Sequence, residues 1–105
     1  MAVTRSDKVY SGTLGTSETT VLTVAASTTF IIKGVWISNS NVEYKYAIVK
    51  IDDKRVVPST VIPPNDAVIL DNLHIPVLTG KTIKVTGEVA RAMDHYIWGI
   101  EEVTS

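Results

Sequence analysis

Turn-forming residues recur at short intervals along this chain, and apolar segments rich in Val, Ile and Thr separate them. β-Branched residues suit a pleated sheet better than a helix because their side chains are stiff at χ1. The nearest approach to a helical apolar spacing is residues 88–95, which would make one turn. Many short strands between regular turn signals predict an all-β sandwich or barrel. The turn signals are Ser11-Gly12, Gly15-Thr16, Ala26-Ser27, Asn39-Ser40-Asn41, Asp52-Asp53, Pro63-Pro64-Asn65-Asp66, Thr79-Gly80 and Thr86-Gly87.

Seven to nine strands follow from the alternation of apolar and polar residues. Residues 29–39 are apolar on both faces, which indicates a central, covered strand, and Gly34 within them indicates a bulge or a close backbone approach. Val9 is expected to point inward, as are Ile83 and Val85. Prolines between residues 58 and 64 predict an edge strand or a loop, since proline cannot donate to a sheet ladder. The expected strands cover residues 8–14, 20–25, 29–39, 42–51, 55–57, 66–71, 72–78, 81–86 and 95–103.

The length of 105 residues supports one small domain. We expect a flexible N-terminal arm at residues 1–7, a β-sandwich at 8–103 and a short tail at 104–105. The sandwich is expected to be a single antiparallel domain with jelly-roll or Greek-key connections.

Composition and charge exclude several classes of protein. Hydrophobic residues make up 45% of the chain and charged residues 20%, which is typical of globular proteins. The net charge of −1 argues against a nucleic-acid partner held by bulk charge. The chain has no cysteine, so it has no disulfide and no thiolate site. No apolar run is long enough to span a bilayer, and the first residues lack the apolar segment of a signal peptide.

The residues that could carry chemistry form no catalytic or metal-binding pattern. The two histidines, His74 and His95, are expected at the surface or rim of the fold. Asp71 with His74, and Asp94 with His95, are too few to bind zinc, which needs three or four ligands. Acids such as those at Asp52-Asp53 and Asn65-Asp66 are expected to cap turns, and Glu101-Glu102 to point to opposite faces of a strand. We therefore expect no enzyme, no cofactor and no metal.

Two features concern binding. Tyr44 and Tyr46 share one strand face, and Tyr96 and Trp98 share another, so they would form either a sugar-stacking platform or part of the core; the core is favoured. Residues 30–37 and 56–62 hold more apolar side chains than a small sandwich covers alone, which indicates a protein partner. The expected partner-binding residues are Val3, Arg5, Val56, Val57, Val61 and Ile62.

Five segments of the chain carry a resemblance to a known family: residues 16–29, residues 31–40 with their Asn-Ser turn, residues 62–66, residues 78–83 and the closing strand 97–103. Through these segments most of the chain resembles small virion structural proteins of tailed bacteriophages. Lys81 stands where those proteins usually have an acid, and residues 91–95 have no counterpart in them. The resemblance implies a β-sandwich that serves as a capsid decoration (cement) protein or as part of a tail or fibre, without an active site.

From these features we expect a non-enzymatic virion protein made in the host bacterial cytoplasm. The leading expectation is a decoration protein that binds across major-capsid subunits, with the N-terminal arm as a strap. Its partners would be copies of itself, with a homotrimer favoured at three-fold positions of the shell, and the major capsid protein or another virion protein. No nucleic acid or membrane is expected as a partner. The alternatives are a tail, baseplate or head–tail component, a carbohydrate-binding module and, last, an enzyme.

Overall fold

The computed structural model describes residues 2–89 and 91–104. This part of the chain contains nine strands joined by turns and loops. Five of them form sheet A, in the order β1-β9-β3-β6 with β7 beside β3, and four form sheet B, in the order β2-β8-β4-β5. All pairs are antiparallel, so the predicted β-sandwich is confirmed. The strands are β1 (Val3–Thr13), β2 (Thr19–Thr23), β3 (Thr28–Asn39), β4 (Lys45–Ile51), β5 (Lys54–Ile62), β6 (Asp66–Leu70), β7 (Ile75–Val77), β8 (Thr82–Gly87) and β9 (Met93–Thr104).

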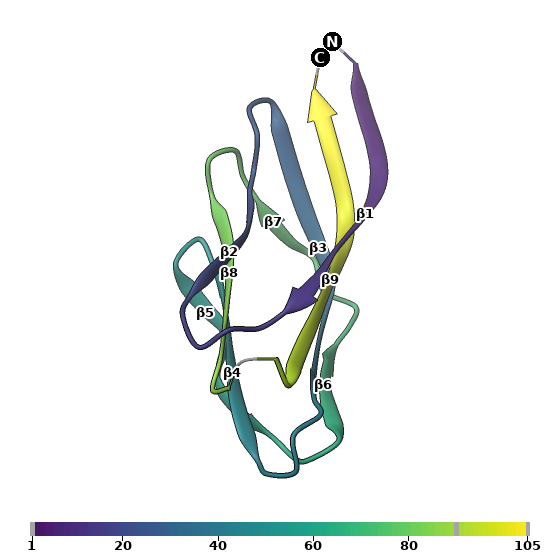
Figure 1. The fold of residues 1–105 in the computed structure, drawn as a ribbon. Helices are drawn as coiled ribbons and strands as arrows, with labels where there is room; N and C mark the ends of the chain where they lie inside the picture. The colour runs from purple at the N-terminus through teal and green to yellow at the C-terminus, as the bar shows by residue number, and fades with distance from the viewer. Residues whose placement is uncertain (1, 90, 105) are drawn as a thin grey trace.

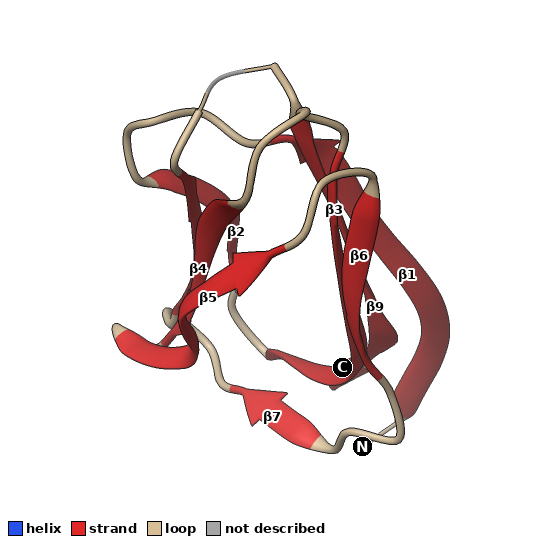
Figure 2. Ribbon diagram, turned by 90° about the horizontal axis from the view of Figure 1, so that it is seen from below, coloured by secondary structure: helices blue, strands red, loops and turns tan. Residues whose placement is uncertain are grey.

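The strand pairs are nested along the chain (Figures 1 and 2). The innermost pair is β4 with β5, and around it lie β3 with β6 and β7, then β2 with β8, and finally β1 with β9. Alternate pairs fall in opposite sheets. If β6 and β7 are taken as one broken strand, this is the connectivity of a jelly roll, in which eight strands fold into two sheets.

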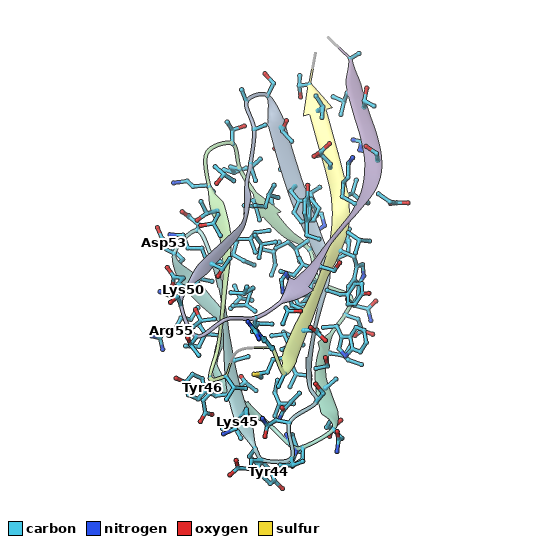
Figure 3. The ribbon with its side chains drawn as sticks, viewed as in Figure 1. Tyr44, Lys45, Tyr46, Lys50, Asp53 and Arg55 are labelled. Carbon is cyan, nitrogen blue, oxygen red and sulfur yellow. The ribbon has the colours of Figure 1, made fainter. Side chains whose placement is uncertain are left out.

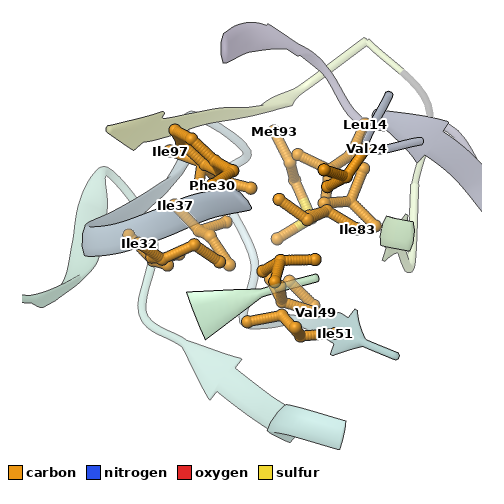
Figure 4. Close-up of a cluster of buried hydrophobic side chains, with 14 of the residues drawn as sticks. Leu14, Val24, Phe30, Ile32, Ile37, Val49, Ile51, Ile83, Met93 and Ile97 are labelled. Carbon is orange, nitrogen blue, oxygen red and sulfur yellow. The ribbon is translucent and has the colours of Figure 1, made fainter. Parts of the chain in front are cut away.

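The core lies between the two sheets (Figure 4). Sheet A contributes alternate side chains of β3 and β9, and sheet B contributes alternate side chains of β4 and β8, because successive residues of a strand point to opposite faces. The predicted inward positions of Ile83 and Val85 are confirmed. The largest fully buried side chains are those of Leu14, Phe30, Ile32, Val35, Ile37, Val49, Ile62, Val77, Ile83, Val85, Met93 and Ile97.

Asn and Asp shape the turns as predicted. Asp52, Asp53 and Asn65 adopt positive φ angles between strands, where these side chains are tolerated better than most. Asn39 is buried at the end of β3, and its amide donates to the backbone carbonyls of Glu43 and Ile62. Asn39 therefore ties the β3–β4 loop to the end of β5.

Two strand faces differ from the expectation. Residues 42–44 precede β4, and the buried residues of β4 are Ala47, Val49 and Ile51, so the tyrosine face points outward. Val9 was expected inside but is 59% exposed, and its neighbour Tyr10 turns inward to pack edge-on against the ring of Phe30. In both strands the residue that reaches the core is the one next to the residue expected there. A shift of one residue along a strand exchanges its inward and outward faces.

The two chain ends also differ from the expectation. The described part of the expected arm belongs to β1, whose ladder with β9 runs without a break from Val3 opposite Thr104 to Thr13 opposite Asp94. Of the expected tail, Thr104 is therefore paired in the sheet, whereas residue 105, like residue 1, lies outside the described residues. The start of β1 and the end of β9 lie at the same end of the molecule (Figure 1).

Candidate interaction surfaces

The outer face of sheet B is charged, and its lysines pair with acidic side chains. Lys50 binds Glu18 at 2.7 Å, and Lys84 binds Asp53 at 3.0 Å and Glu18 at 3.8 Å. The side-chain hydrogen bond from Lys50 holds the pKa of the Glu18 carboxyl below its usual value. Figure 3 shows Lys50, Asp53 and Arg55 on this outer side. This face therefore carries charges of both signs.

The outer face of sheet A has an apolar central part, with charged residues such as Arg5 and Glu102 toward one end. Trp36 of β3 lies between Tyr96 of β9 and Ile69 of β6, and Val9 of β1 lies opposite Trp98. Residues opposite each other in antiparallel strands share a face, so these side chains form one continuous surface. Ile69 is 62% exposed, Tyr96 42% and Trp36 36%. We call this surface the outer apolar face; it consists of Val9, Ile31, Trp36, Ile69, Tyr96 and Trp98.

Aromatic packing orders the outer apolar face. The rings of Trp36 and Tyr96 stack with centroids 5.3 Å apart and planes 21° apart. Beside them the Trp98 ring covers Gly34, where an added Cβ would lie 1.9 Å from the ring. Gly34 thus opens the β3 backbone for Trp98, next to the register shift between Ile32 and Gly34 that the sequence predicted as a bulge.

The predicted placement of the aromatic residues in the core is wrong. Tyr44 is 65% exposed in the loop before β4, and Tyr46, on the outer side of that strand, is also exposed. Tyr96 and the half-buried Trp98 lie on the outer apolar face. The inner positions of β9 are filled by Met93, His95 and Ile97. The sequence reasoning named two members of this face, Tyr96 and Trp98, but not Trp36 and Ile69. The pairing of β3 with β9 places Trp36 beside Tyr96, and the pairing of β3 with β6 places Ile69 beside Trp36.

The expected partner-binding residues do not form one surface. Val3 and Arg5 are exposed on β1, and Arg5 Nε donates to Glu102 Oε2 at 2.6 Å. Val56 and Val61 lie on β5, at the opposite edge of the sandwich; Val61 is exposed, whereas Val56 packs against the core. Ile62 is fully buried, which corrects its assignment to a partner surface: it faces inward at the end of β5, where Asn39 binds its carbonyl. The side chain of Val57 lies outside the described residues.

His95 is buried, contrary to the expectation of a rim histidine. The side chain is 5% exposed and points inward from β9, opposite Gly12 of β1 and Ile37 of β3. Neither ring nitrogen has a hydrogen-bond partner among the described residues. The ring borders a hollow of about 440 Å³ at the open edge of the sandwich, which is also lined by Tyr10, Thr19 and Val21.

Burial lowers the pKa of His95, and the neighbouring Asp94 carboxylate only partly opposes this effect. The unfolded chain takes up this proton near pH 6.5. The folded state keeps the His95 ring neutral. The contribution of the neutral ring to the free energy of unfolding is therefore complete above pH 6.5, and it is lost as the pH falls toward the folded-state pKa of His95. We expect the urea midpoint to fall between pH 7.5 and pH 5.5, and a His95→Leu variant to show a smaller fall.

The matched control is His74→Gln. His74 is exposed, and its Nδ1 atom lies 3.0 Å from Lys33 Nζ. This variant is expected to retain the acid sensitivity of the parent. Equal pH dependence in the parent and in His95→Leu would contradict the assignment to His95.

Other expected sites are dispersed. Glu102 pairs with Arg5. Glu101, the preceding residue of β9, has a different neighbour: burial raises the pKa of Tyr10, and the Glu101 carboxylate raises it further. No group of three or more metal-binding side chains occurs within residues 2–89 and 91–104. The same part of the chain contains no helix long and apolar enough to cross a membrane.

Comparisons with known proteins return only distant structural similarity. The sequence matches no protein-family model and no curated protein. Among solved structures, the fold is similar to a chain of the cyanophage Pam1 capsid asymmetric unit, with a TM-score of 0.39, 14% identity, 99% of this chain covered and 84% of that one. It is also similar to a chain of infectious bursal disease virus, Gt strain, with a TM-score of 0.32 and 14% identity, over 97% of this chain and 32% of that one.

Proposed function

We propose that this chain is a non-enzymatic structural protein of a phage virion. The role that fits best is a capsid decoration (cement) protein that docks on major-capsid subunits through the outer apolar face. The observation that carries the proposal is the contrast between the two sheets: one outer face is covered with paired charges, and the other presents aromatic and aliphatic side chains to solvent. Contiguous exposed apolar surface commonly marks a protein contact.

The proposed mechanism is mechanical. Each copy would cover apolar surface where neighbouring capsid subunits meet, and the aromatic side chains would supply most of the binding energy. Because many copies would bind one shell, modest contacts add up to resistance against internal pressure from the genome. The resemblance of residues 16–103 to virion proteins supports the same role, and a virion location follows from it. The trimer expected at three-fold positions of the shell remains a prediction from symmetry.

Copy number per particle tests this proposal. Gel densitometry of purified virions against the major capsid band should give hundreds of copies in a simple ratio to the capsid protein. A few dozen copies or fewer would overturn the decoration role in favour of a tail, baseplate or head–tail component. Absence from the particle would overturn the virion proposal as a whole.

A carbohydrate-binding module is the second candidate, and one observation favours it. A hollow of about 210 Å³ borders Tyr96 on its β1 side, where Ser11, Thr13 and Asp94 offer polar groups. Thr13 Oγ1 donates to Asp94 Oδ1 at 2.8 Å, so these groups are already ordered. A saccharide would stack on the tyrosine ring and bind the hydroxyl and carboxylate oxygens. Titration with neutral oligosaccharides, followed by tryptophan fluorescence, should show saturation that Tyr96→Ala abolishes; no saturation would exclude this function.

A further inference from the structure

Strand β1 is a long, regular and uncovered sheet edge. It pairs with β9 on one side only, and its residues from Val3 to Val9 are exposed. Figures 1 and 2 show β1 along the outer margin of the molecule, with its N-terminal half away from sheet B. The ladder with β9 has no register shift, so no bulge twists the edge away from a partner. Such an edge presents unpaired backbone N–H and C=O groups and is a template for another strand.

The charges of β1 are arranged around Ser6. Arg5 and Asp7 flank this residue and point to the same side, because they are two positions apart. Arg5 binds Glu102, whereas Asp7 has no ion-pair partner among the described residues. The edge therefore carries a cation and an unpaired anion at equal distances from one central residue.

Symmetry restricts how two copies of this edge can pair. Residues opposite each other in an antiparallel pair share a face. When two identical strands pair in this way, one residue must lie opposite its own copy, and the two-fold axis passes between the two copies of that residue. Axes at Arg5, Asp7 or Lys8 would place like charges directly opposite each other. With the axis at Val9, Arg5 and Asp7 would each face an uncharged residue of the other copy. Only the axis at Ser6 places Arg5 of each copy opposite Asp7 of the other.

We propose that two copies of this chain associate through antiparallel pairing of their β1 strands, with the two-fold axis at Ser6. This register gives Asp7 a cationic partner at both symmetric positions. It also places Val3 opposite Val9 of the second copy, on the side of the outer apolar face, and these side chains are 48% and 59% exposed in one copy. The two outer apolar faces then form one surface across a continuous sheet. This association goes beyond capsid binding and does not depend on it.

Cysteine cross-linking tests the register, because the native chain has no cysteine. Opposite Cα atoms of antiparallel strands lie about 4.5–5.5 Å apart, within the range a disulfide spans. A Ser6→Cys variant should therefore form disulfide-linked dimers under mild oxidation. The matched control is Thr4→Cys, which is also exposed on β1 but would lie about 14 Å from its own copy, four residues along the strand. Cross-linking of Thr4→Cys as fast as Ser6→Cys would overturn the proposed register.

The mass of the native protein in solution tests the association itself. The parent chain should sediment as a dimer at micromolar concentration, and Asp7→Arg should weaken the dimer at least tenfold, because each new cation faces Arg5 of the other copy. Circular dichroism of Asp7→Arg would confirm that the fold is retained. A monomer would overturn the proposal, and a trimer would overturn it in favour of the state expected from shell symmetry. Neither result bears on capsid attachment, which copy number measures separately.

Discussion

A Gly99→Ala variant is expected to lose about 3 kcal/mol of unfolding free energy, at the upper end of the usual cost of overpacking. Gly99 lies in the middle of β9, opposite Ile32, where β3 begins its bulge. A Cβ at this position would lie 2.0 Å from the backbone oxygen of Ile31. No side-chain rotation relieves that contact, so the central pair of strands in sheet A would have to separate. Urea denaturation followed by circular dichroism measures the loss.

Gly15→Ala is the matched control for Gly99→Ala. Gly15 lies in the turn after β1, and nothing lies within 4 Å of a Cβ built there. This variant is expected to change the unfolding free energy by no more than about 0.5 kcal/mol, as at other unconstrained positions. Similar losses in the two variants would show that β9 tolerates a side chain at residue 99 and that the close approach to β3 is not essential.

The contrast between Gly34 and Gly99 shows what the sequence can predict. Gly34 interrupts a long apolar segment, so the pattern alone predicted a bulge or a close backbone approach there. Gly99 lies between Trp98 and Ile100 and looks like part of an ordinary strand. Its constraint arises because the register shift in β3 brings the Ile31 carbonyl over it, and registers between distant strands are not encoded in local alternation.

The choice of inner face was also only partly predictable. Residues 81–86 alternate between apolar and strongly polar side chains, so Ile83 and Val85 could be placed inside correctly. Around β4, large side chains occupy both sets of alternate positions, and the pattern does not say whether Tyr46 or Ala47 faces the core. Asn39 anchors the loop before β4 through bonds across the fold, so that choice depends on tertiary contacts.

The outer apolar face could not be assembled from the sequence for a related reason. Its central members, Trp36 and Tyr96, are far apart in the chain and meet only through the register of β3 with β9. The surplus of apolar residues was recognised in residues 30–37, but the predicted partner surface was placed partly on β5, where Ile62 belongs to the core. The sequence pattern showed the surplus of apolar residues, and strand pairing showed that part of it lies on the outer face of sheet A.

The variant Trp36→Ser is expected to weaken attachment to capsids at least 30-fold if the outer apolar face is the docking surface. A central interface tryptophan commonly contributes 2 kcal/mol or more, and about 2 kcal/mol corresponds to a 30-fold change in affinity. Trp36 occupies that central position, between Tyr96 and Ile69. Cosedimentation of the purified protein with capsids that lack it measures the affinity.

Two features make the Trp36→Ser experiment decisive. Trp36 lies on the outer side of the sheet and is 36% exposed, so Trp36→Ser leaves the core between the sheets intact. The variant loses apolar burial in addition to about 1 kcal/mol of stacking on Tyr96, and thermal melting measures whether it is folded at the temperature of the assay. The control is Tyr44→Ser, which removes an aromatic side chain that is more exposed but lies at one end of the molecule (Figure 3), away from the outer apolar face. Tyr44→Ser should bind as the parent does. Equal loss in both variants would mean that binding depends on exposed aromatic residues in general, and parent-like binding by Trp36→Ser would place the capsid contact on another surface.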